Sequence, residues 1–62
     1  MDVNKYAADK MKQLRIQKNL TQEELAEELK ITQQQVTRYE NNYRKFKQDF
    51  LFKLADYFQV SI

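Results

Sequence analysis

The chain has 62 residues, a net charge of +2 and a pI near 9.0, and it contains no cysteine, histidine, glycine or proline. A chain this short is expected to form one small domain, over 1–62, without room for a catalytic cleft and a second substrate domain. The absence of cysteine and histidine excludes disulfides, thiol or imidazole catalysis and zinc ligation by these residues, and we expect no metal and no cofactor.

Helical periodicity dominates the first segment. Val3, Ala7, Met11 and Leu14 recur at steps of four, four and three residues, which places them on one face of a helix. Asn19 follows, and asparagine can end a helix in the left-handed conformation that glycine usually adopts. We therefore predict a first helix that ends shortly before Asn19.

Two capping-box patterns lie only eleven residues apart, at 21–24 and 32–35. Each has a threonine followed three residues later by Glu or Gln, which marks a helix start. They predict two short helices, over about 22–29 and 33–41, joined by a turn of about three or four residues. Their inward residues are predicted to be Leu25, Ala26, Leu29, Val36 and Tyr39.

The segment 43–47 is predicted to be a basic loop, and a last helix is predicted over about 48–58. The inner face of that helix consists of Leu51, Leu54, Ala55 and Phe58. Phe50 and Tyr57 fall on its flank. They either mark a homodimer interface, formed by this helix and the C-terminal tail, or thicken a small core. The tail is predicted to bury Val60.

The outward face of the 33–41 helix has an unusual composition. With Val36 and Tyr39 inward, a rotation of about 100° per residue places Gln34, Thr37, Arg38 and Asn41 on the opposite face, with Gln33 at its edge. Glutamine can pair with adenine, arginine with guanine, and the threonine methyl can meet that of thymine. A merely solvated face would contain more Glu and Lys, so the pattern favours base recognition.

The charges are also unevenly distributed. Residues 10–18 contain four basic side chains and no acidic one, and residues 38–47 contain four basic side chains and one acid, Glu40. The helix predicted over 22–29 instead contains four glutamates, which are expected to point away from phosphates. A modest net charge can therefore hide a basic, phosphate-binding face.

In these segments the chain resembles the Xre/Cro-type helix-turn-helix family, which includes the lambdoid phage repressors and Cro proteins. The resemblance covers about Lys10 to Ile62, and it is carried by the residues at 14–15, 20–26, 32–36, 39–41, 54–55 and 60–61. It implies an all-α fold, a compact bundle of four to five short helices with a helix-turn-helix unit at about 21–41. It also implies a double-stranded DNA partner and a regulator of transcription, a repressor rather than an activator.

The resemblance implies roles for individual residues. Those expected to read bases in the major groove are Gln33, Gln34, Thr37 and Arg38. Those expected to hold the DNA backbone are Gln22, Thr32, Asn41, Arg44 and Lys45. Gln22 is in addition expected to brace Gln33. Arg15 and Glu40 are expected to form a partly buried ion pair between the first and third helices.

The chain departs from the family pattern at the turns. Lys30 stands where the family usually has glycine, so a conserved turn geometry would give it a positive φ, at a cost on the order of 1 kcal/mol. Asn42 also replaces a glycine. Phe46 and Lys47 replace a proline and a serine N-cap, which leaves the start of the last helix the least defined boundary.

Two other classes of protein are alternatives. An antitoxin-like or other protein-interaction module of the same fold would use the acidic and aromatic helices to contact a protein, and a co-purifying partner or the genomic neighbours would reveal it. An enzyme is disfavoured, because only surface carboxylates are candidates for catalysis.

No signal-peptide core and no apolar run of roughly 20 residues is present. We expect the protein to be located in the cytoplasm of a bacterial cell or of a phage-infected host.

Overall fold

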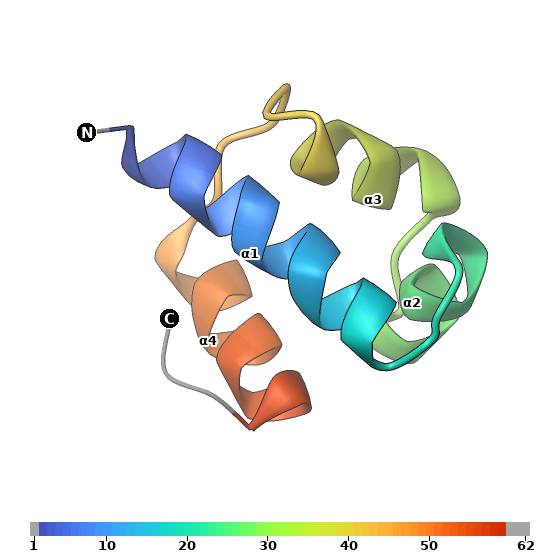
Figure 1. Cartoon of the computed structure of the whole chain (residues 1–62). Coiled ribbons are helices and arrows are strands. Elements are labelled where there is room, and N and C mark those ends of the chain that lie inside the picture. The colour runs from blue at the N-terminus through green and yellow to red at the C-terminus, as the bar shows by residue number, and fades with distance from the viewer. Residues whose placement is uncertain (1, 60–62) are drawn as a thin grey trace.

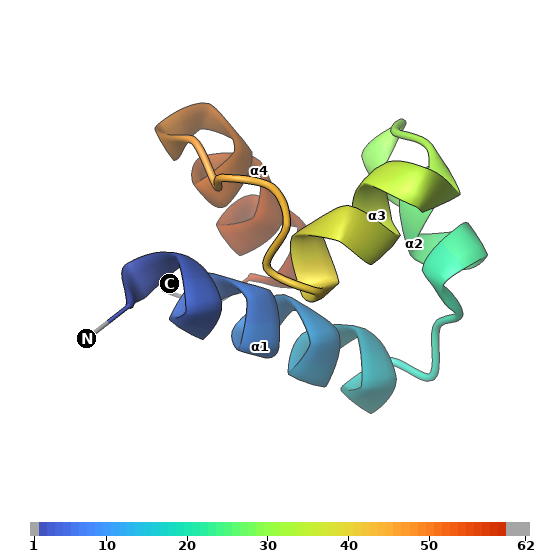
Figure 2. The same cartoon turned by 90° about the horizontal axis from the view of Figure 1, so that it is seen from above.

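The computed structural model describes residues 2–59, and four helices lie in this range. They are α1 (Val3–Gln17), α2 (Gln22–Leu29), α3 (Gln33–Glu40) and α4 (Gln48–Phe58). α2 packs against α3 and α4, and α1 packs against α3 and α4. α1 crosses the molecule with α3 above it and α4 below it (Figure 1). The segment that joins α3 to α4 passes beside the N-terminal turns of α1 (Figure 2).

All four helices contribute to one apolar core. Its largest fully buried side chains are Met11, Leu25, Leu29, Leu54 and Val36. Burial of each such side chain stabilises the fold by about 1.5–3 kcal/mol. The small residues Ala7, Ala8 and Ala26 are also buried. The predicted inward residues of α2 and α3 are confirmed, and so is the predicted range of α4.

The core differs from the predicted pattern at two residues, Val3 and Phe46. Val3 is 68% exposed, so its predicted place on the inner face is wrong. It is the first residue of α1 and lines an open pocket between α1 and α4, together with Ala7, Phe46 and Leu51. Phe46, predicted as part of a basic loop, is only 7% exposed, and its ring centroid lies 4.8 Å from that of Tyr39.

The capping boxes at both predicted positions are confirmed. Thr21 Oγ1 accepts a hydrogen bond from the Glu24 N–H, and the Glu24 carboxylate accepts one from the Thr21 N–H. Thr32 and Gln35 make the same reciprocal pair at the start of α3. α4 begins after Lys47 without a side-chain cap, as expected for a lysine in place of the family's serine.

All four described helices end at or near a left-handed residue although the chain has no glycine. These residues are Asn19, Lys30, Asn42 and Gln59, with φ of 59°, 60°, 63° and 55°. At the first three, the N–H of the following residue donates to a carbonyl five positions back, as in the Schellman motif. The closing bonds join Leu20 to Arg15, Ile31 to Ala26 and Tyr43 to Arg38. The positive φ expected for Lys30 is therefore confirmed.

Lys30→Gly is expected to stabilise the domain by about 1 kcal/mol. Lysine has a Cβ that crowds the backbone in the left-handed region, whereas glycine does not. Urea unfolding followed by circular dichroism measures the gain. Asn19→Gly is the matched control, because asparagine tolerates the same conformation and its replacement should gain less. Equal gains in the two variants would argue against strain at Lys30.

The flanking aromatic residues of α4 pack within the domain. The Phe50 ring stacks on Tyr39 with centroids 4.2 Å apart, and the Tyr57 hydroxyl donates to Glu28 of α2. Burial and this carboxylate raise the pKa of the Tyr57 phenol above its ordinary value. Of the two alternatives for this pair, the structure shows the thickened core. Phe52 is 64% exposed. The predicted burial of Val60 and the predicted tail interface lie outside the described residues.

Candidate nucleic-acid interface

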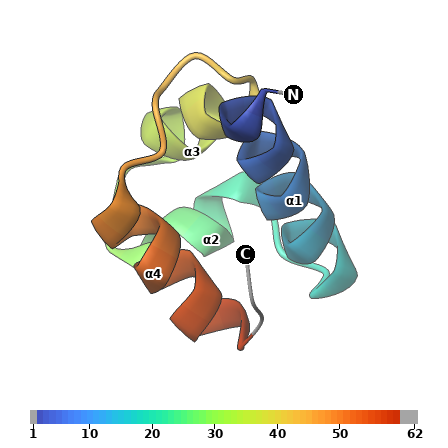
Figure 3. The ribbon, with the colours of Figure 1, turned by 90° about the vertical axis from the view of Figure 1, so that its left-hand side faces the viewer.

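α3 presents a polar outer face because its apolar residues point into the core. Val36 is fully buried and Tyr39 nearly so. The exposed residues at or near the other side are Gln33, Gln34, Arg38 and Asn41, and Thr37 is partly buried. α3 lies at the edge of the molecule, and no other helix covers its outer side (Figure 3). The outward face predicted from periodicity is therefore accessible to a macromolecule.

A buried ion pair fixes α3 against α1. Arg15 Nε donates to Glu40 Oε2 at 2.8 Å, and a second guanidinium nitrogen donates to Glu40 Oε1 at 3.2 Å. Arg15 also donates to the Leu20 carbonyl at 2.8 Å. The two side chains are 13% and 2% exposed. Because an unpaired buried charge is expensive, these bonds hold the end of α3 in one position.

Gln22 extends this network from the first residue of α2. Its Nε2 donates to Glu40 Oε1 at 3.1 Å, and its Oε1 accepts from the Thr37 hydroxyl at 2.9 Å. The Thr37 hydroxyl also lies 3.1 Å from the Gln33 carbonyl. Among the described residues, the Gln22 amide thus bonds to Thr37 and Glu40 and not to the Gln33 side chain. The Gln22 amide has a second N–H beyond the one that Glu40 accepts.

The network changes what Thr37 offers to a ligand. Its hydroxyl hydrogen is directed to acceptors within the protein, so Thr37 has no donor left for an external contact and can offer its methyl group and its oxygen lone pairs. Sequence reasoning missed this network, because no local pattern relates Gln22 to residues on the next helix.

The loop after α3 carries exposed cations. Arg44 and Lys45 are exposed, and Arg44 Nε donates to the Tyr39 hydroxyl at 3.2 Å. Glu40 is the single acid between residues 38 and 47, and it is buried against Arg15. The exposed charges of this segment are therefore all positive: Arg38, Arg44, Lys45 and Lys47. The excess of basic over acidic side chains in residues 38–47 is therefore larger at the surface than in the sequence.

The described residues show neither a metal cluster nor a membrane span. Between residues 2 and 59, no three Asp or Glu side chains gather where they could hold a metal ion. In the same range, no helix combines the length and the apolar character that crossing a lipid bilayer requires.

Two short helices joined by the turn at residues 30–32, the second with a buried inner face and a polar, basic outer face, define a helix-turn-helix protein. Comparison with known protein families matches residues 11–62 to the Helix-turn-helix family, and the chain belongs to the Xre/Cro-like type of that family. It is therefore a DNA-binding domain. No curated protein and no solved structure matches the chain.

Proposed function

We propose that the protein is a sequence-specific transcriptional regulator, and specifically a repressor, that places α3 in the major groove of double-stranded DNA. The observation that carries this proposal is the outer face of α3, which displays short amides and one arginine beside an exposed basic loop. The major groove of B-DNA is wide enough to admit an α-helix. The repressor role rests on the resemblance to the lambdoid phage repressors and Cro proteins.

The side chains proposed to read bases differ in the base that each can recognise. Gln33 and Gln34 present amides that pair bidentately with adenine, and Arg38 presents a guanidinium that pairs with guanine. Thr37 contributes its methyl group, against a thymine methyl, because its hydroxyl hydrogen points to Gln22 and to the Gln33 carbonyl. Each bidentate pair discriminates against the wrong base by about 1–3 kcal/mol.

The phosphate-binding residues surround α3. They are Gln22 with its second amide N–H, Thr32 at the N-cap of α3, and Asn41, Arg44 and Lys45 after α3. The Thr32 oxygen already accepts the Gln35 N–H, so its hydroxyl hydrogen is the group that can donate to a phosphate. These contacts position the domain on the duplex without selecting its sequence.

Two copies are proposed to bind two half-sites about one helical turn apart, in the cytoplasm of a bacterial cell or of a phage-infected host. A weak homodimer through α4 and the C-terminal tail would set this spacing. Phe50 and Tyr57 are engaged within the domain, so the exposed Phe52 is the aromatic of α4 best placed to contact a second copy. Sedimentation that shows only monomer at high concentration, with and without DNA, would contradict the dimer.

In vitro selection of bound duplexes from a random pool tests the main proposal, since it yields site, spacing and stoichiometry together. On the selected duplex, Gln34→Ala is expected to lower affinity about tenfold to a hundredfold and to relax preference at one base pair. Lys45→Ala is expected to weaken binding equally on selected and unrelated duplexes and to reduce the salt slope by about one. If neither substitution changes binding, the outer face of α3 is not the interface.

A further inference from the structure

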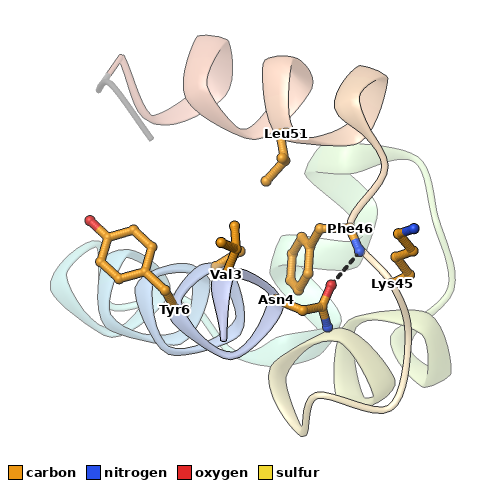
Figure 4. Close-up of a pocket in the computed structure, with 7 residues that line it drawn as sticks. Val3, Asn4, Tyr6, Lys45, Phe46 and Leu51 are labelled. Carbon is orange, nitrogen blue, oxygen red and sulfur yellow. Dashed lines mark hydrogen bonds between the residues drawn. The ribbon is translucent and has the colours of Figure 1, made fainter. Parts of the chain in front are cut away.

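One side chain ties the first turn of α1 to the loop between α3 and α4. Asn4 Oδ1 accepts from the Phe46 N–H at 2.7 Å, the bond drawn in Figure 4. Asn4 Nδ2 donates to Asn42 Oδ1 at 2.6 Å and to the Arg44 carbonyl at 3.1 Å. These three partners lie within five consecutive residues, and the basic residue Lys45 lies among them.

Asn4 lies on the N-terminal side of the residues that match the family. The match covers residues 11–62, whereas α1 begins at Val3. Asp2 caps the start of α1, because its carboxylate accepts from the Asn4 and Lys5 N–H groups. Buried Ala7 and Ala8 pack the first turns of α1 against the core, which places Asn4 beside the loop.

Asn42 is the second residue to which the Asn4 side chain bonds. This residue adopts a left-handed conformation, with φ of 63°. Glycine would suit that backbone but would supply no side-chain acceptor. Asn42 adopts the left-handed backbone and also supplies an acceptor, since its Oδ1 accepts from Asn4.

We propose that Asn4 is a positioning residue for DNA binding: it presets the 42–46 loop so that Arg44 and Lys45 meet phosphates without first being ordered. This inference rests on the proposed function. The loop has two further anchors, the buried Phe46 ring and the bond from Arg44 to Tyr39, but Asn4 alone bonds to both sides of Lys45 among the described residues. Ordering flexible groups upon binding lowers affinity, and a preset loop avoids that loss.

The test is Asn4→Ala in the full chain, assayed on the selected duplex and on an unrelated duplex of equal length. Affinity is expected to fall about fivefold to tenfold on both duplexes, with base preference unchanged. Hydrogen exchange at the Phe46 amide should accelerate while the buried segment around Leu54 stays protected. Val3→Ala is the matched control, because Val3 is the exposed neighbour of Asn4 in the same turn of α1 and makes none of the three bonds, and it should leave affinity unchanged.

Two further variants separate positioning from a merely structural role. In an Arg44→Gln/Lys45→Gln background, Asn4→Ala should have no further effect on affinity, and a persisting loss would overturn the proposal. Asn42→Gly removes one of the three bonds in a backbone that glycine favours, and it should weaken binding about twofold to threefold. Unchanged affinity in both Asn4→Ala and Asn42→Gly would also overturn it. If Gln34→Ala does relax base preference in the same assays, the proposed function survives that failure.

Discussion

Arg15→Met is expected to destabilise the domain by about 3–5 kcal/mol, because it leaves the buried Glu40 carboxylate without a cation. The Glu40 side chain is only 2% exposed, so water cannot replace the guanidinium. A domain of this length has a total stability of roughly 3–9 kcal/mol. The single substitution should therefore unfold a large share of the molecules at room temperature. Urea unfolding followed by circular dichroism measures the loss.

The double variant Arg15→Met/Glu40→Met separates charge from packing. With both ions removed, no buried charge remains, and most of the lost stability should return. About 1 kcal/mol of the stability should not return, since the bond from Arg15 to the Leu20 carbonyl is absent in both variants. If the double variant is no more stable than Arg15→Met, the cost does not arise from an uncompensated Glu40.

The helices could be predicted because their signals are local. Each capping box closes within one turn, between Thr21 and Glu24 or between Thr32 and Gln35, so its partners are neighbours in sequence. The inward and outward faces of α3 follow from helical geometry alone. Lys30 needed a further step, because its left-handed conformation was expected from the family turn and not from lysine itself.

The remaining features depend on contacts between distant segments. The bonds of Asn4 span 38 to 42 residues, and no sequence period connects positions so far apart. Phe46 was assigned to a basic loop because its neighbours are lysine and arginine, yet its ring enters the core. Val3 continues the apolar period of α1, but the period does not show where the neighbouring helices stop covering it.

The same distinction applies to the candidate interface. Which residues of α3 face outward could be predicted, since exposure there follows from the burial of Val36 and Tyr39. The direction of the Thr37 hydroxyl could not, because its acceptor Gln22 lies on another helix. The chemistry offered by a surface residue is thus decided partly by buried partners.

Tyr39 connects three parts of the molecule. Its ring stacks on Phe50 of α4 with an interplanar angle of 7°, and it also contacts the Phe46 ring. Its hydroxyl accepts from Arg44 Nε in the basic loop. The same residue therefore fixes α3 on α4 and orients one of the proposed phosphate-binding side chains.

Tyr39→Ala is expected to destabilise the domain by about 3–5 kcal/mol, because it removes a buried ring and leaves a cavity between α3 and α4. Tyr39→Phe is the matched control. It keeps both ring contacts, so most of the stability should remain. It removes the acceptor for Arg44, so its effect should appear in DNA affinity, as a modest loss that is equal on selected and unrelated duplexes. Urea unfolding and DNA titration of both variants measure the two effects separately. A large stability loss in Tyr39→Phe would show that the hydroxyl, and not the ring, holds the helices together.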